Sequence, residues 1–254
     1  MNLTFLGTGT SQGVPVISCK CPVCSSDDPR DKRLRTSALL TMDNGDNLLF
    51  DIGPDFREQM LREGVSHLEG ILVTHAHRDH VAGLDDVRAF NYVQHQRMDV
   101  YANAVALNII HHDYGYIFAE SPYPGLPQVN LHEVSDAPFF VGVHKVVPIS
   151  AMHLKMPVTG YRIGDLTYIT DASYISAEEL VKMRNSKVLV INALRHEKHF
   201  SHFCLSEALD VIRQVAPEQA YLTHLSHEYG RYADSLAELP SNVHIAYDRL
   251  SVDI

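Results

Sequence analysis

The sequence predicts a layered α/β fold in which short strands alternate with helices. Apolar runs of strand length alternate with helical segments along the whole chain, which is typical of layered α/β proteins. The chain has 254 residues, 45% of them hydrophobic and 20% charged, so it can bury a full core in one large domain spanning 1–254. No internal repeat, low-complexity tract or evident linker divides it.

The first part of the chain predicts a hairpin, a helix and a buried strand. Strands are expected at 3–6, 37–42 and 47–52, and the last two flank "DNGD", whose Asn-Gly pair favours a tight hairpin turn. A helix is expected over 54–64, because Pro54 suits the first turn and Gly64 suits the end. The run "GILVT" (70–74) has the composition of a buried strand.

The remainder continues the alternation. Further strands are expected at 98–102, 144–150, 159–163, 166–170, 187–191, 219–223 and 243–248, and helices at 81–94, 103–112, 176–184 and 204–215. The segment "ESPYPGLPQ" (120–128) is rich in Pro and Gly and is expected to be a loop. Periodicity alone does not give the order of the strands in a sheet.

Composition and the N-terminal residues favour a cytoplasmic protein that is not a general nucleic-acid binder. No run approaches 18 apolar residues, so no membrane-spanning helix is expected. The start "MNLTFLGTGT" lacks the basic and apolar regions of a signal peptide, which predicts a cytoplasmic location. The formal net charge of −10 repels nucleic acid at long range and makes a general phosphate-backbone binder an unfavourable interpretation.

The stretch "HAHRDH" directly follows the predicted strand 70–74 and predicts a metal site. Histidine is the commonest metal ligand among side chains, and the chain contains 16 histidines. In a chain leaving a strand, residues two apart point the same way, so His75 and His77 can bind the same metal. Asp79 and His80 follow and can address a second metal nearby. A solvated loop that happens to be rich in histidine is the less favoured alternative.

Further ligand-type side chains follow other predicted strands. His153 comes after "VVPIS", Asp171 after "LTYIT", and His224 after "QAYLT". Each alone would more often be an ordinary partly buried histidine or a turn residue. Ligand sites in α/β sheets gather at strand ends, so together these residues predict one site at one rim of a sheet.

At these residues the sequence resembles the metallo-β-lactamase-fold hydrolases. The match consists of THAHRDH (74–80), His153, "ITDAS" with Asp171 and "LTH" with His224. The resemblance implies a four-layer αββα sandwich with a dinuclear metal centre at its edge. By this analogy one metal is held by His75, His77 and His153, the other by Asp79, His80 and His224, and Asp171 bridges them. Nitrogen and carboxylate ligands suit Zn²⁺ or Mn²⁺, and also Fe.

The stretch "SCKCPVC" contains Cys19, Cys21 and Cys24, and clustered cysteines in a cytosolic chain favour a metal over disulfides. With "GTGTSQGVP" before it, this C-x-C-x-x-C resembles the branch that includes the cyclic phosphodiesterase of the carbon–phosphorus lyase (phosphonate) pathway. The resemblance implies a structural zinc whose fourth ligand is His227, which would tie a zinc knuckle at 18–25 to the C-terminal region. Three free thiols are the alternative, and Cys204 is expected to be a packed residue.

A histidine before the helix expected at 204–215 is the predicted general acid. In the resembling family a histidine at this place enters the active site; His202 matches best and His199 is the reserve. The implied reaction is in-line attack on phosphorus by a metal-bridging hydroxide, which Asp79 can orient, while His202 protonates the leaving alkoxide. The sequence assigns no substrate-binding residue. The predicted function is hydrolysis of a small, cyclic phosphodiester, and the resemblance suggests a homodimer.

Three alternatives share parts of this pattern. A tRNA 3′-processing endonuclease has the same metal ligands, but it needs a long basic arm, and the interval 81–152 is poor in Lys and Arg. A thioester or lactone hydrolase is compatible with the metal centre, although the cysteine cluster and His202 favour a phosphodiesterase. A non-catalytic binding protein, like some relatives in pyrroloquinoline quinone biosynthesis, is disfavoured because all seven expected ligands are present.

Overall fold

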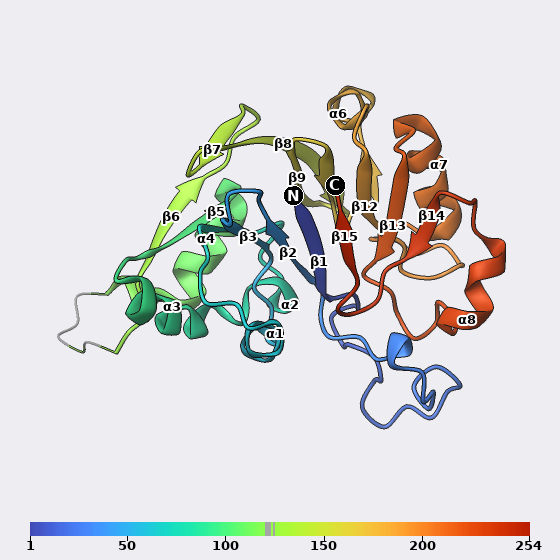
Figure 1. Ribbon diagram of the computed structural model, residues 1–254, viewed down its shortest axis with the longest axis horizontal. Helices are drawn as coiled ribbons and strands as arrows, with labels where there is room; N and C mark the ends of the chain where they lie inside the picture. The colour runs from blue at the N-terminus through green and yellow to red at the C-terminus, as the bar shows by residue number, and fades with distance from the viewer. Residues whose placement is uncertain (120–122, 124) are drawn as a thin grey trace.

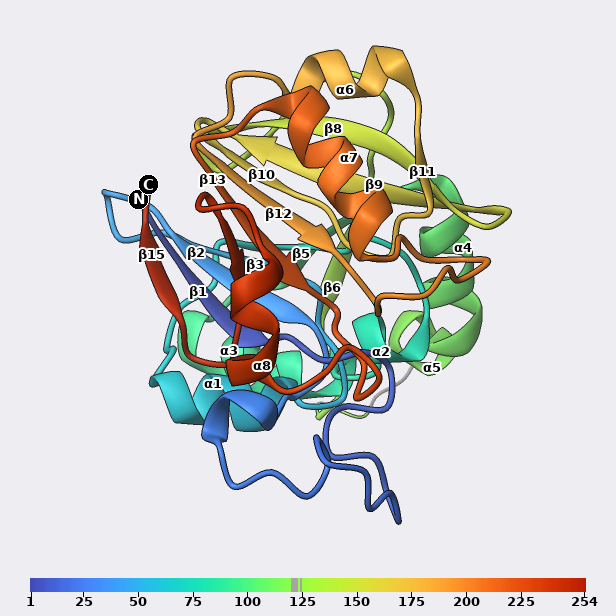
Figure 2. The same ribbon diagram turned by 90° about the vertical axis from the view of Figure 1, so that its right-hand side faces the viewer.

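The structure is a computed structural model that describes residues 1–119, 123 and 125–254. Two β-sheets pack face to face, and helices cover the two outer faces (Figures 1 and 2). This arrangement confirms the α/β class and the four-layer αββα sandwich predicted from the sequence. Within the described residues, no helix is both long and apolar enough to cross a membrane.

The first sheet contains both antiparallel and parallel strands. Its order is β15 (Ser251–Asp253), β1 (Asn2–Gly7), β2 (Ser37–Thr41), β3 (Asn47–Phe50), β4 (Gly70–Leu72), β5 (Met98–Ala102) and β6 (Val129–Glu133). Neighbours from β15 to β3 are antiparallel, and neighbours from β3 to β6 are parallel. The carboxyl ends of β3, β4, β5 and β6 therefore meet at one edge of the sheet.

The second sheet has a similar division. Its order is β11 (Tyr174–Ile175), β8 (His144–His153), β9 (Met156–Ile163), β10 (Leu166–Tyr168), β12 (Val188–Asn192), β13 (Gln219–Thr223) and β14 (Val243–Ile245), and β7 (Phe139–Val141) pairs with β8. Strands β10, β12, β13 and β14 are parallel neighbours, so their carboxyl ends also share an edge.

The helices divide between the two outer faces (Figure 1). The first sheet is covered by α1 (Phe56–Glu63), α3 (Val87–Gln94), α4 (Ala104–Asp113) and α5 (Gly115–Phe118), and the second by α6 (Ala177–Met183) and α7 (Leu205–Val215). The short helices α2 (Arg78–Val81) and α8 (Tyr232–Ser235) lie in loops. Among the described residues, three single-turn 3₁₀ helices span Pro29–Asp31, Leu84–Asp86 and Leu236–Glu238.

Alternation along β3 shows why the layers stack in this way. Leu48 and Phe50 point into the apolar layer between the sheets, where the Phe50 ring stacks on Tyr168 with ring centroids 4.4 Å apart. Leu49 points the other way, into the layer beneath the helices. Because successive side chains of a strand point to opposite faces, an almost continuous apolar run is buried on both sides.

The structure corrects the predicted helix 81–94, which is three short pieces. The chain breaks at Gly83, whose backbone N–H donates to the carbonyl of Ile52 at 2.9 Å. A Cβ at Gly83 would lie 2.3 Å from the carbonyl oxygen of Gly53, so the two segments touch through their backbones. This contact bends the chain toward the loop that follows β3.

Several short strands were not predicted, namely β6, β7, β11 and β15. They have two to five residues and little apolar alternation, and they are recognisable only from the strands with which they pair. Of the loop predicted at 120–128, positions 120–122 and 124 lie outside the described residues.

Candidate metal centre

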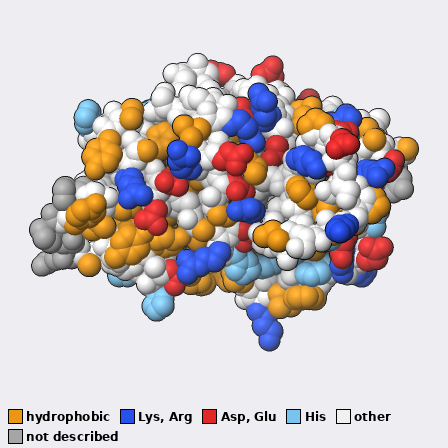
Figure 3. All heavy atoms as spheres, turned by 90° about the horizontal axis from the view of Figure 1, so that it is seen from below, with side chains coloured by type: hydrophobic (Ala, Val, Ile, Leu, Met, Phe, Trp, Pro, Cys, Tyr) orange, Lys and Arg blue, Asp and Glu red, His pale blue; other side chains and the backbone are white. Residues whose placement is uncertain are grey.

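The predicted ligands come together where the strands of both sheets end. His75 follows β4, His153 ends β8, Asp171 follows β10, and His224 directly follows β13. The backbones of Asp171 and His224 have positive φ angles of 57° and 55°. Such strained conformations concentrate at functional sites. Seen from below relative to Figure 1, several histidine side chains lie together near the middle of the surface (Figure 3).

The ligand atoms form two groups that share one carboxylate. In each group all ligand atoms lie within 4.8 Å of one another; one group is His75, His77, His153 and Asp171, and the other is Asp79, His80, Asp171 and His224. One oxygen of Asp171, Oδ2, is 3.6 Å from His75 Nε2, and the other, Oδ1, is 3.0 Å from His224 Nδ1. The two oxygens of Asp171 thus face different groups, as a bridging carboxylate requires.

Asp51 supports this centre and was missed at the sequence level. Its fully buried carboxylate accepts hydrogen bonds from the backbone N–H of Thr74 at 2.7 Å and from Nδ1 of His80, also at 2.7 Å. The bond to Nδ1 turns Nε2 of His80 toward the centre. That buried Nε2 makes no hydrogen bond within the described residues, and the nearest oxygen of Asp79 is 3.2 Å away.

His153 is oriented in the same manner. Its Nδ1–H donates to the backbone carbonyl of Ser201 at 2.6 Å, which leaves Nε2 as the free lone pair. Metal-binding histidines usually donate their other ring N–H to a carboxylate or a carbonyl, which fixes the tautomer. The buried unpartnered nitrogen of His80 and the oriented ring of His153 fit residues that bind a metal.

The surroundings of the first ligand group favour neutral imidazoles and an ionised Asp171. Burial lowers the pKa values of His75, His77 and His153. Burial alone would raise the pKa of Asp171, but the neighbouring imidazoles of His224 and His80 hold it well below its usual value. Metal ligands must be deprotonated, so this donor set is suited to divalent cations.

His80 is the exception among the buried histidines. Burial alone would lower its pKa, but three facing carboxylates, those of Asp79, Asp171 and Asp51, raise it well above the usual value. This concentration of negative charge attracts a cation, which is a proton when no metal is bound.

His202 faces the shared carboxylate without belonging to either ligand group. Its Nε2 lies 3.3 Å from Oδ2 of Asp171, and its ring centroid lies 4.5 Å from that of His153. Its Nδ1 is 3.1 Å from the hydroxyl of Ser201 and 3.2 Å from Nδ1 of His199. His199 therefore stands behind His202, on the side away from Asp171.

The three clustered cysteines and His227 also meet. The Sγ atoms of Cys19 and Cys21 are each 3.4 Å from Nδ1 of His227, and Cys24 lies within the same 4.8 Å group. The backbone N–H of Cys24 is the main cause that lowers the pKa of Cys21, to about 6. Cys204 is fully buried at the start of α7 and takes no part in the cluster.

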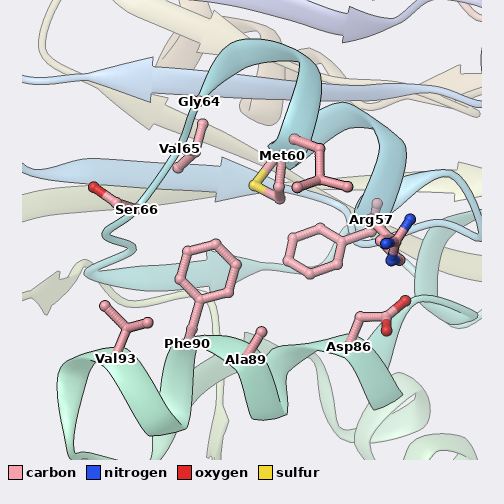
Figure 4. A pocket seen from close by; sticks show the side chains of 11 residues that line it. Arg57, Met60, Gly64, Val65, Ser66, Asp86, Ala89, Phe90 and Val93 are labelled. Atoms are coloured by element: carbon pink, nitrogen blue, oxygen red, sulfur yellow. The ribbon is translucent and has the colours of Figure 1, made fainter.

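A cavity of about 280 Å³ lies between this cluster and the metal centre. Its lining includes Gln12, Arg195, His202, His224 and His227, so the cavity contacts both sites. A second cavity, of about 500 Å³, lies between α1 and α3, where Phe90 and Val93 face Met60 and Val65 (Figure 4). The second cavity shares no residue with either ligand group.

Known sequences place the chain in a large family. Residues 46–225 match the family model of the beta-lactamase superfamily domain. The octanoyltransferase of Porphyromonas gingivalis is 42% identical over 256 residues, which cover the whole chain but 52% of that protein. Coenzyme PQQ synthesis protein B of Methylobacterium radiotolerans is 34% identical over 101 residues, which cover 35% of this chain and 34% of that one. The chain thus spans about half, or less, of the length of these curated relatives.

Solved structures agree in fold. A crystal structure of a diphosphatase from the PhnP family has a TM-score of 0.92 and 37% identity, covering 100% of this chain and 97% of that one. Zn²⁺-bound PqqB from Methylobacterium extorquens has a TM-score of 0.77 at 18% identity, with both chains fully covered. Human tRNase Z, short form, has a TM-score of 0.72 at 19% identity, with coverage of 100% and 99%. The last two show the fold alone. The chain belongs to the beta-lactamase superfamily and has the metallo-β-lactamase fold that its motifs predicted.

Proposed function

We propose that the chain is a metal-dependent phosphodiesterase that hydrolyses a small, cyclic phosphodiester. The observation that carries the proposal is the position of His202. It presents an imidazole nitrogen 3.3 Å from the one carboxylate that both ligand groups share, yet it is not needed as a ligand. A proton donor beside a two-metal site suits a reaction in which an alkoxide leaves. The likeness to a PhnP-family diphosphatase supports chemistry at phosphorus.

The two ligand groups would each hold one divalent metal, Zn²⁺ or Mn²⁺ with Fe also suitable, and Asp171 would join them. When bound, such metals act as Lewis acids on phosphoryl oxygens and lower the pKa of a water. The Cys19, Cys21, Cys24 and His227 cluster would hold a structural zinc, because four thiolate or imidazole ligands leave no position open for substrate. In this proposal the chain acts as one domain that includes the knuckle.

Other residues of the chain donate a proton, orient the attacking water and position the ligands. His202 donates a proton to the departing oxygen, and Ser201 and His199 hold its other ring nitrogen. Asp79, 8% exposed at the rim, would help to hold the second metal and would orient the attacking water. Asp51 and the carbonyl of Ser201 fix the rings of His80 and His153, so the site needs little rearrangement during the reaction.

The size of the cavity favours a small substrate. A volume of about 280 Å³ is of the size that takes a small-molecule ligand. Arg195 lines the cavity, and its guanidinium forms an ion pair with Glu228. The positive charge that Arg195 presents to a substrate is therefore partly neutralised. Together with the net charge of −10, this supports a small-molecule substrate over tRNA.

The test is a substrate panel on metal-analysed protein. It contains bis(p-nitrophenyl) phosphate, ribose cyclic phosphates, 2′,3′-cyclic nucleotides, a dinucleoside diphosphate and pre-tRNA. The proposal expects turnover of cyclic phosphodiesters above all others. Preferred cleavage of the diphosphate would reassign the reaction to a phosphoanhydride, and preferred cleavage of pre-tRNA would reassign it to a nuclease.

A second candidate is thioester hydrolysis, because a relative with 42% identity across the whole chain is an octanoyltransferase. An octanoyl group is an acyl group, and a two-metal site can polarise a thioester carbonyl. This chain matches 52% of that relative, so its octanoyl transfer can belong to the part outside the match. Adding an octanoyl thioester to the panel separates the two: hydrolysis of the thioester without hydrolysis of any phosphodiester would favour this second function.

A further inference from the structure

We infer a further divalent-cation site at the edge of the first sheet that lies opposite the catalytic rim. Its ligands are Asp46, His67 and Glu69, whose ligand atoms all lie within 4.8 Å of one another. Asp46 is in the turn between β2 and β3, and the other two residues precede β4. These positions are where the strands begin, whereas His75 and Asp51 follow the ends of β4 and β3. The site is therefore separate from the centre that carries the proposed function.

The backbone holds these three residues in place. The backbone N–H of Glu69 donates to the carbonyl of Asn47 at 2.8 Å, and the side chain of Asn47 donates to the carbonyl of His67 at 3.1 Å. A Cβ at Gly142 would lie 2.5 Å from the Glu69 carboxylate, so a glycine there, with a φ of 54°, makes room for that carboxylate. The ligands thus lie in short segments directly before the strands β3 and β4.

His144 orients Asp46 as a supporting residue would. Its Nε2 donates to Oδ2 of Asp46 at 2.8 Å, and the side-chain amide of Asn44 donates to the same oxygen at 2.7 Å. In the part of the chain that the structure describes, both of these bonds end on Oδ2, which leaves Oδ1 for a cation. Histidine and amide partners of this kind are the usual second layer around a metal-binding carboxylate.

The chemistry of the donors points to Zn²⁺ or Mn²⁺. One imidazole and two carboxylates carry a charge of −2, which a divalent cation neutralises, and mixed nitrogen and oxygen donors suit these two metals. The three side chains are only partly exposed, at 26%, 43% and 28% for Asp46, His67 and Glu69. Water would complete the coordination. Because His144 opens β8 of the second sheet, a bound ion would link the two sheets.

The chain offers a matched control for the His67 and Glu69 pair. His132 and Asp99 form a similar pair on the surface of the first sheet, with Nε2 2.9 Å from the carboxylate. The side chain of His132 is 43% exposed, as is that of His67. Within the described residues, the His132 pair has no third ligand in a group of the same compactness.

The experiment is calorimetric titration of Zn²⁺ into protein whose catalytic and cysteine sites have already been loaded with zinc. The wild-type chain should bind about one further ion, and His67→Ala and Glu69→Gln should each lose that event while His132→Ala retains it. His144→Ala should weaken it by roughly 10- to 100-fold, and His144→Gln, which keeps a donor, should recover part of the affinity.

Thermal unfolding provides a second readout that does not depend on activity. Added Zn²⁺ should raise the Tm of the loaded wild-type and His132→Ala proteins, but not that of His67→Ala. Circular dichroism checks that each variant is folded. The inference would be overturned if the wild-type chain bound no further Zn²⁺, or if wild type and His67→Ala bound it equally. His67 and Glu69 would then be a surface ion pair without a metal.

Discussion

The carboxylate of Asp171 contacts residues of both ligand groups and also His202. Its two oxygens face different ligand groups, and a third contact reaches His202 at 3.3 Å. Neighbouring imidazoles keep its pKa low although it is buried, so it is a carboxylate throughout the working pH range. A residue that faces both ligand groups and the proposed proton donor also sets the distances among them.

The role of His202 can be separated from that of the ligands. His202→Ala should lower kcat for the preferred substrate by roughly 10²-fold, the usual size of general acid–base catalysis, while metal content is unchanged. His199→Ala is the control, since its ring stands behind His202 and only positions it; its effect should be smaller. Near-normal turnover by His202→Ala, measured with an activated ester and a natural ester, would remove it from the mechanism.

Asp51 should act through His80. The backbone at position 51 has a positive φ of 59°, which asparagine tolerates, so Asp51→Asn should keep the local backbone. The substitution removes the negative charge that orients Nδ1 of His80. We expect metal affinity at the second ligand group to fall by roughly 10- to 100-fold, with restored activity at high metal concentration. Metal-dependent activity curves measure this shift. An unchanged half-saturating metal concentration would show that the hydrogen bond to His80 is dispensable.

At the scale of elements, the group of Cys19, Cys21, Cys24 and His227 brings an N-terminal loop together with the loop after β13. His224 and His227 belong to one loop and turn to different sites, three residues apart. The N-terminal loop also meets this loop directly, because the backbone N–H of Thr10 donates to Leu225 at 3.2 Å and that of Leu225 to Thr8 at 2.9 Å. These two loops together form part of the wall of the cavity beside His202.

Cys21→Ser tests the knuckle. The variant should lose about one zinc per chain and unfold at a temperature lower by several degrees, because a structural zinc contributes its binding energy to folding. Cys204→Ser removes a buried thiol outside the cluster and should keep its metal content. Elemental analysis with thermal unfolding checks both. If Cys21→Ser retained all its zinc, the cluster would be four ordinary side chains.

At the scale of the whole molecule, Asp248 joins segments from both ends of the chain. Its nearly buried carboxylate accepts hydrogen bonds from the backbone N–H groups of Thr8 at 3.0 Å and Leu34 at 2.8 Å. Burial raises its pKa from 3.8 to about 6. The folded chain then binds this proton more tightly than the unfolded chain does.

This shift gives a pH dependence with a definite sign. The contribution of Asp248 to stability is full below about pH 4 and is lost as the pH rises through about 6, a change of about 3 kcal/mol. In Asp248→Asn this contribution to the pH dependence should disappear, even if the variant is less stable throughout. Urea unfolding of both proteins from pH 4 to 7 measures the difference. A difference that did not vary with pH would contradict the raised pKa.

The metal ligands could be predicted from local motifs, because ligand-type side chains come soon after apolar runs that predict strands. Asp51 was not predicted as a supporting residue, although it also ends an apolar run, because its partner His80 becomes evident only in three dimensions. The strands β6 and β15 were missed for a similar reason, since pairing partners define them. The choice between His202 and His199 rests on their positions relative to Asp171.

The pairing of β1 with β15 places the first and last residues side by side (Figures 1 and 2). The amino group of Met1 lies 3.5 Å from the carbonyl oxygen of Ile254. Because β1 starts where β3 starts, both termini emerge at the edge away from His75 and Asp171. A second protein domain could thus be appended at either terminus without covering the cavity, and a short peptide joining the two could allow the chain to be reopened elsewhere by circular permutation.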